Sequence, residues 1–344
     1  MKAIFFLIFI FCSILSSYSQ TNQEFLDRGK SKMEQQDFKG AIEDFSKAIE
    51  LNPKDAEAYN NRGLAKAQME DYQGALIDFS KVIELDPKDS KAFYLRALAK
   101  NQSNDYHGAI DDFNKAIELD PKYAEAYSLR GTSKNGIEDY QGAIADCSKA
   151  IELDPKSSEP YYYRGLAKNQ LDDYKGAIED FNKAIELDPK LSNAFYFRGL
   201  VKNQSEDYKG AIEDCTKAIE LDPKYTDAYS LRGTSKNGIE DYQGAIEDCS
   251  KAIELDPKYE DAYYYRGLAK NQLKDFKGAI EDFNKAIELN PKWSNAFYFR
   301  ALTKNQLNDY KGAITDCNKA LELNPEYAEA YWLRGTSKNG LKDY

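Results

Sequence analysis

Small and apolar residues recur along the chain at helical spacing, in pairs of short segments. Between residues 56 and 89, the first segment has such residues at Ala58, Tyr59, Gly63 and Ala67. The second has the i, i+3, i+4, i+7 pattern of a buried helical stripe, at Ala75, Leu76, Phe79, Val82 and Ile83. Asp71 is a good N-cap for the second helix, and Pro87 disfavours helix at the residue before it. The pattern therefore predicts a helix, a short turn, a second helix and a stop.

This two-helix pattern repeats with a period of 34 residues. Prolines keep that step from Pro53 to Pro325, arginines from Arg28 to Arg334, and glycines from Gly40 to Gly312. Nine full repeats start at Asn22, Ala56, Ser90, Ala124, Ser158, Ser192, Thr226, Glu260 and Ser294, and a partial tenth covers 328–344. Each residue of a repeat is numbered below from position 1, so that Ala56 is at position 1 of its repeat.

The spacing within one repeat resembles that of the tetratricopeptide repeat, which has an aromatic residue at position 4, Gly at 8, Ala at 20, an aromatic at 24 and Pro at 32. Residues 56–89 match it at Tyr59, Gly63, Ala75, Phe79 and Pro87. The resemblance covers residues 22–344. It implies an all-α fold, an α-solenoid of stacked helix-turn-helix repeats that form a right-handed superhelix, with the first helices along the concave side.

Blocks of three repeats recur as well. The segment 126–144 has the same sequence as 228–246, and the block begins once more at Ala330. The chain therefore ends inside a repeat. Either the last helix caps the stack or the chain is a fragment of a longer protein, and we favour the fragment because the last segment lacks a specialised polar cap.

The first 19 residues are typical of a cleavable signal peptide. Lys2 precedes an apolar run from Ile4 to Leu15 that is too short to span a bilayer, and Ser17 and Ser19 place cleavage before Gln20. An uncleaved anchor or a lipoprotein signal that uses Cys12 is the alternative. We expect a secreted or periplasmic protein that is not inserted in the membrane after cleavage.

The net charge of −11 argues against nucleic acid as a partner, because phosphates require a basic face. Candidate chemistry is sparse too. His107 is the single histidine, and acidic pairs such as Glu179 and Asp180 recur on a polar helical face. We expect no enzyme activity, no metal site and no cofactor.

Four cysteines occupy position 24, where other repeats have phenylalanine: Cys147, Cys215, Cys249 and Cys317. A cysteine in place of a buried aromatic indicates a packing role. Equivalent positions of neighbouring repeats lie about 8–10 Å apart or more, which exceeds the reach of a disulfide of about 7 Å between Cα atoms. The pattern predicts four buried, unbridged thiols.

The repeats depart from the family pattern in having Arg at position 7, Lys at position 11 and Asp at position 23. A partly buried guanidinium needs a carboxylate or carbonyl partner. We expect a repeated Arg–Asp pair that fixes one helix against another, either within a repeat or between neighbours. An anion-binding ladder is the less favoured interpretation.

The resemblance implies that positions 2, 5, 9, 12 and 13 face a concave groove. Position 12 is Asn101, Asn135, Asn169, Asn203, Asn237, Asn271, Asn305 and Asn339, and position 5 is often aromatic, as Tyr94, Tyr162, Tyr196, Tyr264, Tyr298 and Trp332. An Asn amide both donates and accepts, and Tyr offers rigid contact area. We expect these amides to face solvent and to bind a protein or an extended peptide, although duplication of the blocks would also copy them.

The function that follows is a non-enzymatic scaffold for a protein or peptide partner. Two alternatives stay open: a regulatory or substrate-binding arm of a longer protein, and a glycan-binding module of the cell envelope.

Overall fold

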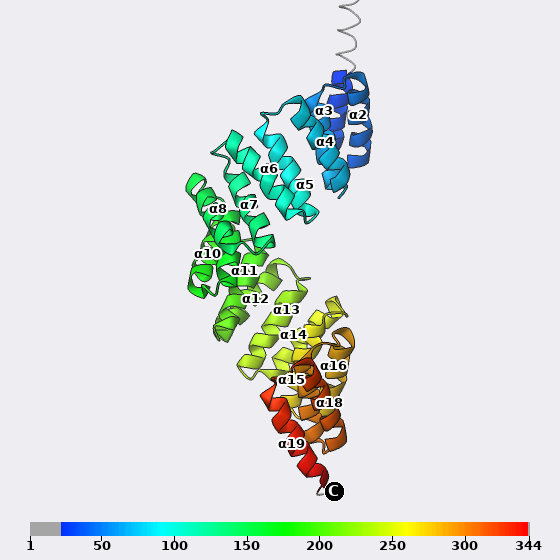
Figure 1. Cartoon of the computed structure of the whole chain (residues 1–344), viewed down its shortest axis with the longest axis vertical. Coiled ribbons are helices and arrows are strands. Elements are labelled where there is room, and N and C mark those ends of the chain that lie inside the picture. Colours follow the sequence, from blue (N-terminus) through cyan, green and yellow to red (C-terminus); the bar gives the residue numbers. More distant parts are fainter. Residues whose placement is uncertain (1–21, 343–344) are drawn as a thin grey trace, which may run out of the picture. The chain divides into compact units, whose positions relative to one another are not determined.

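The computed structural model describes residues 22–342, which form helices joined by short turns and contain no strand. The signal peptide expected at 1–19 lies outside the described residues. The chain divides into two compact parts: an N-terminal half up to Leu171 and a C-terminal half from Asp172 (Figure 1). The prediction of an all-α fold with paired helices is confirmed.

The N-terminal half begins with a helix at 22–34, followed by α2 (Phe38–Leu51). It continues with α3 (Ala56–Gln68), α4 (Tyr72–Leu85), α5 (Ser90–Gln102), α6 (Tyr106–Leu119), α7 (Ala124–Gly136), α8 (Tyr140–Leu153) and α9 (Glu159–Gln170). The helix at 22–34 and the odd-numbered helices from α3 on are the first helices of the repeats, and the even-numbered ones are the second helices.

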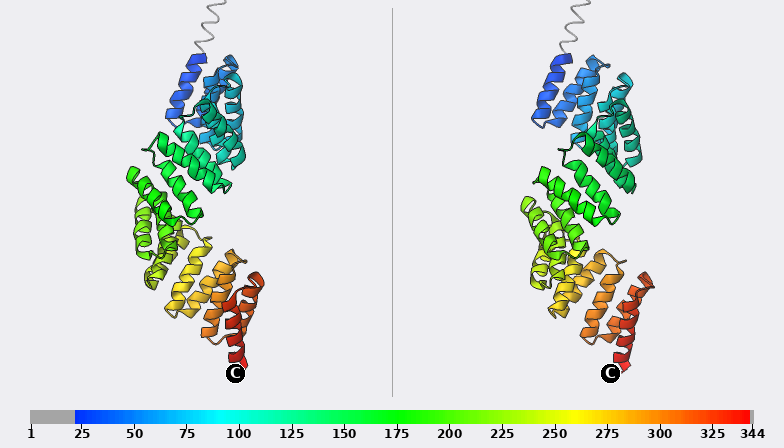
Figure 2. Two further views of the ribbon diagram at one scale, coloured as in Figure 1. Left: turned by 60° about the vertical axis from the view of Figure 1, so that its left-hand side comes forward. Right: turned by 90° about the vertical axis from the view of Figure 1, so that its left-hand side faces the viewer.

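The C-terminal half contains α10 (Tyr174–Leu187), α11 (Ser192–Gln204), α12 (Tyr208–Leu221), α13 (Thr226–Gly238) and α14 (Tyr242–Leu255). It ends with α15 (Glu260–Gln272), α16 (Phe276–Leu289), α17 (Ser294–Gln306), α18 (Tyr310–Leu323) and α19 (Ala328–Lys342). In both views of Figure 2 the two helices of a repeat lie side by side, as α5 and α6 do, and each second helix also packs on the next first helix in its half.

The turn between the two helices has the same construction in every full repeat. The Asp at position 16 is the N-cap of the second helix, and its carboxylate accepts a hydrogen bond from the backbone N–H of the Gly at position 19, as Asp71 does from Gly74 at 2.9 Å. A Cβ on Gly74 would lie 2.1 Å from Asp71 Oδ2, so the cap and the glycine are required together. The residue before the cap, such as Glu70, has a left-handed φ of 61°.

The core is a narrow seam between the helices of each repeat. Gly63 on α3 faces Phe79 on α4, and a Cβ at Gly63 would lie 2.8 Å from the Phe79 ring. Gly233 faces Cys249 in the same way, at 2.7 Å from Sγ. A glycine at position 8 therefore lets the first helix approach the side chain at position 24, whether that is a ring or a thiol.

The cysteines at position 24 are buried and unbridged, as predicted: Cys147, Cys215, Cys249 and Cys317. Burial raises the pKa of Cys215 and Cys249 to about 12 and that of Cys317 to about 11. These three thiols are therefore protonated at neutral pH, and their reactive thiolate form is suppressed.

We expect a chain that starts at Gln20 to show four free thiols by mass spectrometry after alkylation in urea, without prior reduction. In the native state the same reagent should label these thiols far more slowly, because all four are buried. Two or fewer alkylated thiols in urea, or equal rates in native and unfolded chain, would contradict this placement.

Candidate functional site

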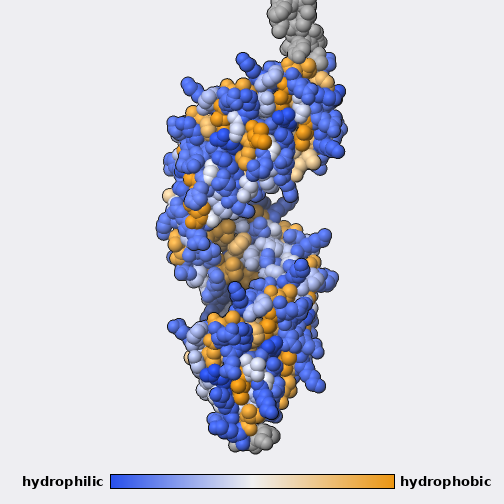
Figure 3. All heavy atoms as spheres, turned by 45° about the vertical axis from the view of Figure 1, so that its right-hand side comes forward, coloured by the Kyte–Doolittle hydropathy of each residue, from blue (hydrophilic) through white to orange (hydrophobic). Residues whose placement is uncertain are grey.

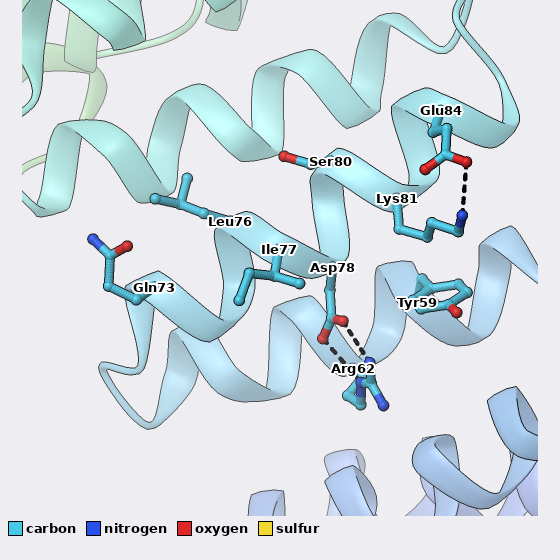
Figure 4. Close-up of a pocket in the computed structure, with 9 residues that line it drawn as sticks. All are labelled: Tyr59, Arg62, Gln73, Leu76, Ile77, Asp78, Ser80, Lys81 and Glu84. Carbon is cyan, nitrogen blue, oxygen red and sulfur yellow. Dashed lines mark hydrogen bonds and ion pairs between the residues drawn. The ribbon is translucent and has the colours of Figure 1, made fainter.

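An arginine–aspartate pair at positions 7 and 23 joins the two helices of a repeat. In the repeat that starts at Ala56, Arg62 on α3 donates from Nε to Asp78 Oδ2 at 3.0 Å and from Nη2 to Oδ1 at 2.6 Å (Figure 4). The Asp78 side chain is fully buried, so this two-pronged bond satisfies a carboxylate that water does not reach. The pairing left open by the sequence is thus within a repeat.

The same pair occurs in seven other repeats: Arg28–Asp44, Arg96–Asp112, Arg130–Asp146, Arg198–Asp214, Arg232–Asp248, Arg266–Asp282 and Arg300–Asp316. The Lys at position 11 adds a second cation, as Lys66 does at 2.7 Å from Asp78 Oδ2. Hydrogen bonds from Arg28 and Lys32 lower the pKa of Asp44 to about 2, against the opposing effect of its burial.

The arginine also reaches the preceding repeat. Nη1 of Arg62 donates to Ser46 Oγ at 3.1 Å, and Nη1 of Arg130 donates to Asn114 Oδ1 at 2.7 Å. The guanidinium lies over the ring at position 4, with Cζ of Arg62 5.5 Å from the centroid of Tyr59. One guanidinium therefore holds three elements: its own helix, the second helix of its repeat and the second helix before it.

Within each half the first helices lie on the inner side of the stack. Successive first helices contact one another, as α5 and α7 do in the N-terminal half and α13 and α15 do in the C-terminal half. Successive second helices have no comparable contact in the described residues. The rows of positions that the resemblance places in a groove therefore lie on the inner face of each half.

Most of the predicted asparagines are half-exposed and also bond to the next repeat, which the expectation of solvent-facing amides did not include. Nδ2 of Asn203 donates to Ser235 Oγ at 2.8 Å, in the next first helix. Four others make an equivalent bond to the Ser or Thr at position 10 of the next repeat, or to the carbonyl at position 6 where position 10 is Ala. These are Asn271 to Thr303, Asn305 to Ser337, Asn135 to the Tyr163 carbonyl, and Asn237 to the Tyr265 carbonyl.

Asn101 also bonds to the next repeat, because its Oδ1 accepts a hydrogen bond from Ser133 Oγ at 3.2 Å in the following first helix. Asn169 is half-buried, and Asn339 is exposed. The asparagine row is therefore in large part a set of bonds between repeats.

The predicted aromatic residues at position 5 pack mainly against the aromatic residue at position 34 of their own repeat. Ring centroids lie 4.8 Å apart for Tyr94 and Tyr123, 5.0 Å for Tyr196 and Tyr225, 4.4 Å for Tyr264 and Trp293, and 4.9 Å for Tyr298 and Tyr327. Tyr162 instead contacts Tyr163 edge-on at 5.2 Å. Trp332 on α19 is 68% exposed.

Two hollows in the N-terminal half were not predicted. The larger, of about 540 Å³, is lined by α4 residues between Gln73 and Glu84 and by Tyr59 and Arg62 of α3 (Figure 4). It exposes Ile77, which stands where most other repeats have an acidic residue. The second, of about 270 Å³, lies between α3 and α5 on the inner face and is lined by apolar side chains together with two glutamines and a tyrosine.

The inner-face hollow occurs where position 12 is not asparagine. Ala67 occupies that position on α3, so no amide bridges from there to α5. The other lining residues are Leu64, Gln68, Tyr72, Phe79, Leu95, Leu98, Ala99 and Gln102. The sequence carried a signal for this hollow, because position 12 is Met33 and Ala67 in the first two repeats and becomes asparagine only from Asn101 onward.

The described residues place no three His, Cys, Asp or Glu side chains together in a way that could hold a metal ion. Among residues 22–342 no helix has both the length and the apolar character that crossing a bilayer requires. On the face drawn in Figure 3, hydrophilic side chains predominate and hydrophobic ones form separate areas.

Three family models match the chain. The one described as tetratricopeptide repeat matches 56–89, 158–191, 192–225, 260–292 and 294–327, and a second of the same description matches 124–157. A model described as TPR repeat matches 29–70, 98–134 and 239–274. A comparison with curated protein sequences found no significant match.

Solved structures show the same fold. The APC/C hetero-tetramer Cut9–Hcn1 is similar with a TM-score of 0.61 and 17% identity, over 90% of this chain and 74% of that chain. A tetratricopeptide repeat protein from Parabacteroides merdae gives 0.60 and 20%, over 73% of this chain and all of the other. PilF of Pseudomonas aeruginosa gives 0.56 and 15%, over 62% and 97%. At these identities the likeness concerns the fold.

The asparagine bonds lead to a stability prediction. Replacing Asn203 or Asn305 by Ala should lower the free energy of unfolding by about 1 kcal/mol each, because a hydrogen bond to a buried hydroxyl is lost. Asn339→Ala, at an exposed amide, should change it by less than about 0.5 kcal/mol. Urea unfolding followed by circular dichroism measures all three, and equal small effects would show that the bonds between repeats contribute nothing.

Proposed function

The chain belongs to the tetratricopeptide repeat family, and on that premise we propose that it is a non-enzymatic scaffold that holds an extended segment of another protein against the inner face of its first helices. The observation that carries the proposal is the apolar hollow between α3 and α5. It opens on the inner face and its volume of about 270 Å³ suits one apolar side chain of the bound segment.

The inner face around the hollow favours an extended segment over a compact ligand. Leu64 and Leu98 at position 9 are half-buried, and Gln68 and Gln102 at position 13 line the same hollow. Apolar side chains beside amides give one anchor for a side chain and donors and acceptors for a peptide backbone. A segment that crosses successive first helices meets this combination at a spacing set by the repeats.

We further propose that the scaffold acts outside the cytoplasm, as a secreted or periplasmic protein, on the basis of the predicted cleavage before Gln20. The net charge of −11 supports a protein partner rather than nucleic acid. A glycan-binding module is an alternative that the experiment below separates, and a regulatory arm of a longer protein is a second alternative.

The test selects binders from a displayed library of random twelve-residue peptides and, in parallel, from an array of envelope glycans. We expect peptides with a common apolar residue to be enriched. Ala67→Trp fills the hollow and should weaken a selected peptide at least tenfold in fluorescence anisotropy, because the anchor side chain is displaced.

The matched control is Ile77→Trp, which makes a comparable addition of bulk at an exposed position on α4. It should leave peptide affinity unchanged, and circular dichroism should show both variants to be folded. Enrichment of glycans without peptides, or equal affinity of a selected peptide for both variants, would contradict the proposal.

A further inference from the structure

A third cavity, of about 30 Å³, lies in the N-terminal half where α8 ends and α7 and α9 begin. Its lining consists of Ala124, Glu125, Ser128, Ala150, Asp154, Ser157, Glu159 and Pro160. Glu125 and Glu159 are at position 2 and Ser128 is at position 5 of their repeats, so the cavity belongs to the inner face. About 15 Å³ admits one water molecule, and this cavity therefore accepts a group of one or two such volumes.

The deepest polar group of the cavity has no partner. Ser128 is 3% exposed, and its Oγ makes no hydrogen bond in the structure. Ala150 and Pro160, which also line the cavity, are buried and apolar. A buried hydroxyl without a partner costs free energy, so the site is built to receive a group that completes it.

The outer part of the cavity is acidic. Glu125, Asp154 and Glu159 are exposed there, and no Lys, Arg or His is part of the lining. Neither Glu125 nor Glu159 makes an ion pair with a described residue, and Asp154 Oδ1 accepts a hydrogen bond from the backbone N–H of Lys156 at 3.0 Å. Burial, followed by the charges of Glu125 and Glu159, raises the pKa of Tyr94 to about 12.

The ends of the neighbouring helices do not cancel this charge. The N-termini of α7 and α9 contribute roughly half a positive charge each, and the C-terminus of α8 contributes roughly half a negative charge. Three carboxylates outweigh that sum, so the cavity attracts a cation. The described residues include no group of three acidic side chains placed for a metal ion, which leaves an organic cation.

The second block of three repeats shows why the cavity exists. Residues 126–144 and 228–246 are identical, and in that alignment Ser157 corresponds to Tyr259. The Tyr259 hydroxyl donates to Asp227 Oδ1 at 2.6 Å, and Asp227 is the counterpart of Glu125. Position 34 is aromatic in most repeats from Ser90 onward, and Ser157 is the small exception that leaves the space open.

We propose that the cavity between α7, α8 and α9 binds a primary ammonium group, the head of a lysine side chain in the segment held on the inner face. An ammonium is close to a water molecule in size and has three donors, one for Ser128 Oγ and two for the carboxylates. A guanidinium is planar and larger and does not fit this volume. The inference rests on the proposed function and gives it a specificity: the partner carries a lysine at this point.

The test uses the whole chain and a small probe, N-acetyl-lysine methylamide, with N-acetyl-norleucine methylamide as the uncharged control. The amide resonance of Ser128 is followed by NMR in chain labelled with ¹⁵N-serine, and its assignment comes from Ser128→Ala. We expect a saturable shift with the lysine probe only. Glu125→Gln combined with Glu159→Gln should weaken the probe at least tenfold.

Two variants swap the residues at the equivalent positions 157 and 259. Ser157→Tyr places in the cavity the residue that fills its counterpart, and it should abolish the shift. Tyr259→Ser should create a second site, seen as a new lysine-dependent shift of Ser230, the counterpart of Ser128. The Tyr at position 34 of other repeats indicates that Ser157→Tyr is compatible with the fold.

Equal shifts with the norleucine control, no saturable shift, or an unchanged shift in Ser157→Tyr would each overturn the lysine pocket. These outcomes differ from failure of the scaffold function, which is measured with the selected peptides. If those peptides still bind, and Ala67→Trp lowers their affinity, the scaffold function stands and only the lysine pocket is wrong.

Discussion

The buried carboxylate at position 23 is the constraint on which the stack depends. Removing a charged group from water is costly unless a partner of good geometry replaces the water. In this chain the guanidinium at position 7 supplies two parallel hydrogen bonds, and Arg62 illustrates how its third nitrogen ties the repeat to the one before. The pair fixes the angle within a repeat and the contact between repeats at the same time, and each copy of the repeat inherits both.

That constraint shapes the surface available to a partner. Once the stack is set, most of the regular inner-face side chains already have partners in the protein: Asn203 bonds to Ser235 of the next repeat, and Tyr94 packs on Tyr123 of its own repeat. The places that remain open are the irregular ones. Ala67 replaces an asparagine and leaves an apolar hollow, and Ser157 replaces an aromatic residue and leaves a polar one. In an array of near-identical repeats, we therefore propose that the recognition surface arises from the exceptions.

The helices, caps and thiols followed from the sequence because each depends on neighbours within one repeat. The cap at Asp71 is three residues from its donor, and the pair of Arg62 and Asp78 is separated by one turn between helices. The bonds of the asparagines could not be predicted, because Asn203 and Ser235 lie 32 residues apart and meet only when two first helices pack side by side. The cavity at Ser128 needed the structure for the same reason, although Ser157 marked its place.

The most direct test of this account is a double-mutant cycle on Arg232 and Asp248. Arg232→Met, Asp248→Leu and the double variant are unfolded in urea, and Arg334→Met serves as the control, since Arg334 lies in a repeat whose described residues stop before position 23. We predict that each single variant at the pair loses about 2–3 kcal/mol, that the double variant recovers at least about 2 kcal/mol of the summed loss, and that the control loses less than about 1 kcal/mol. Additive losses at Arg232 and Asp248, within about 0.5 kcal/mol, would show that the buried pair does not hold the repeat together.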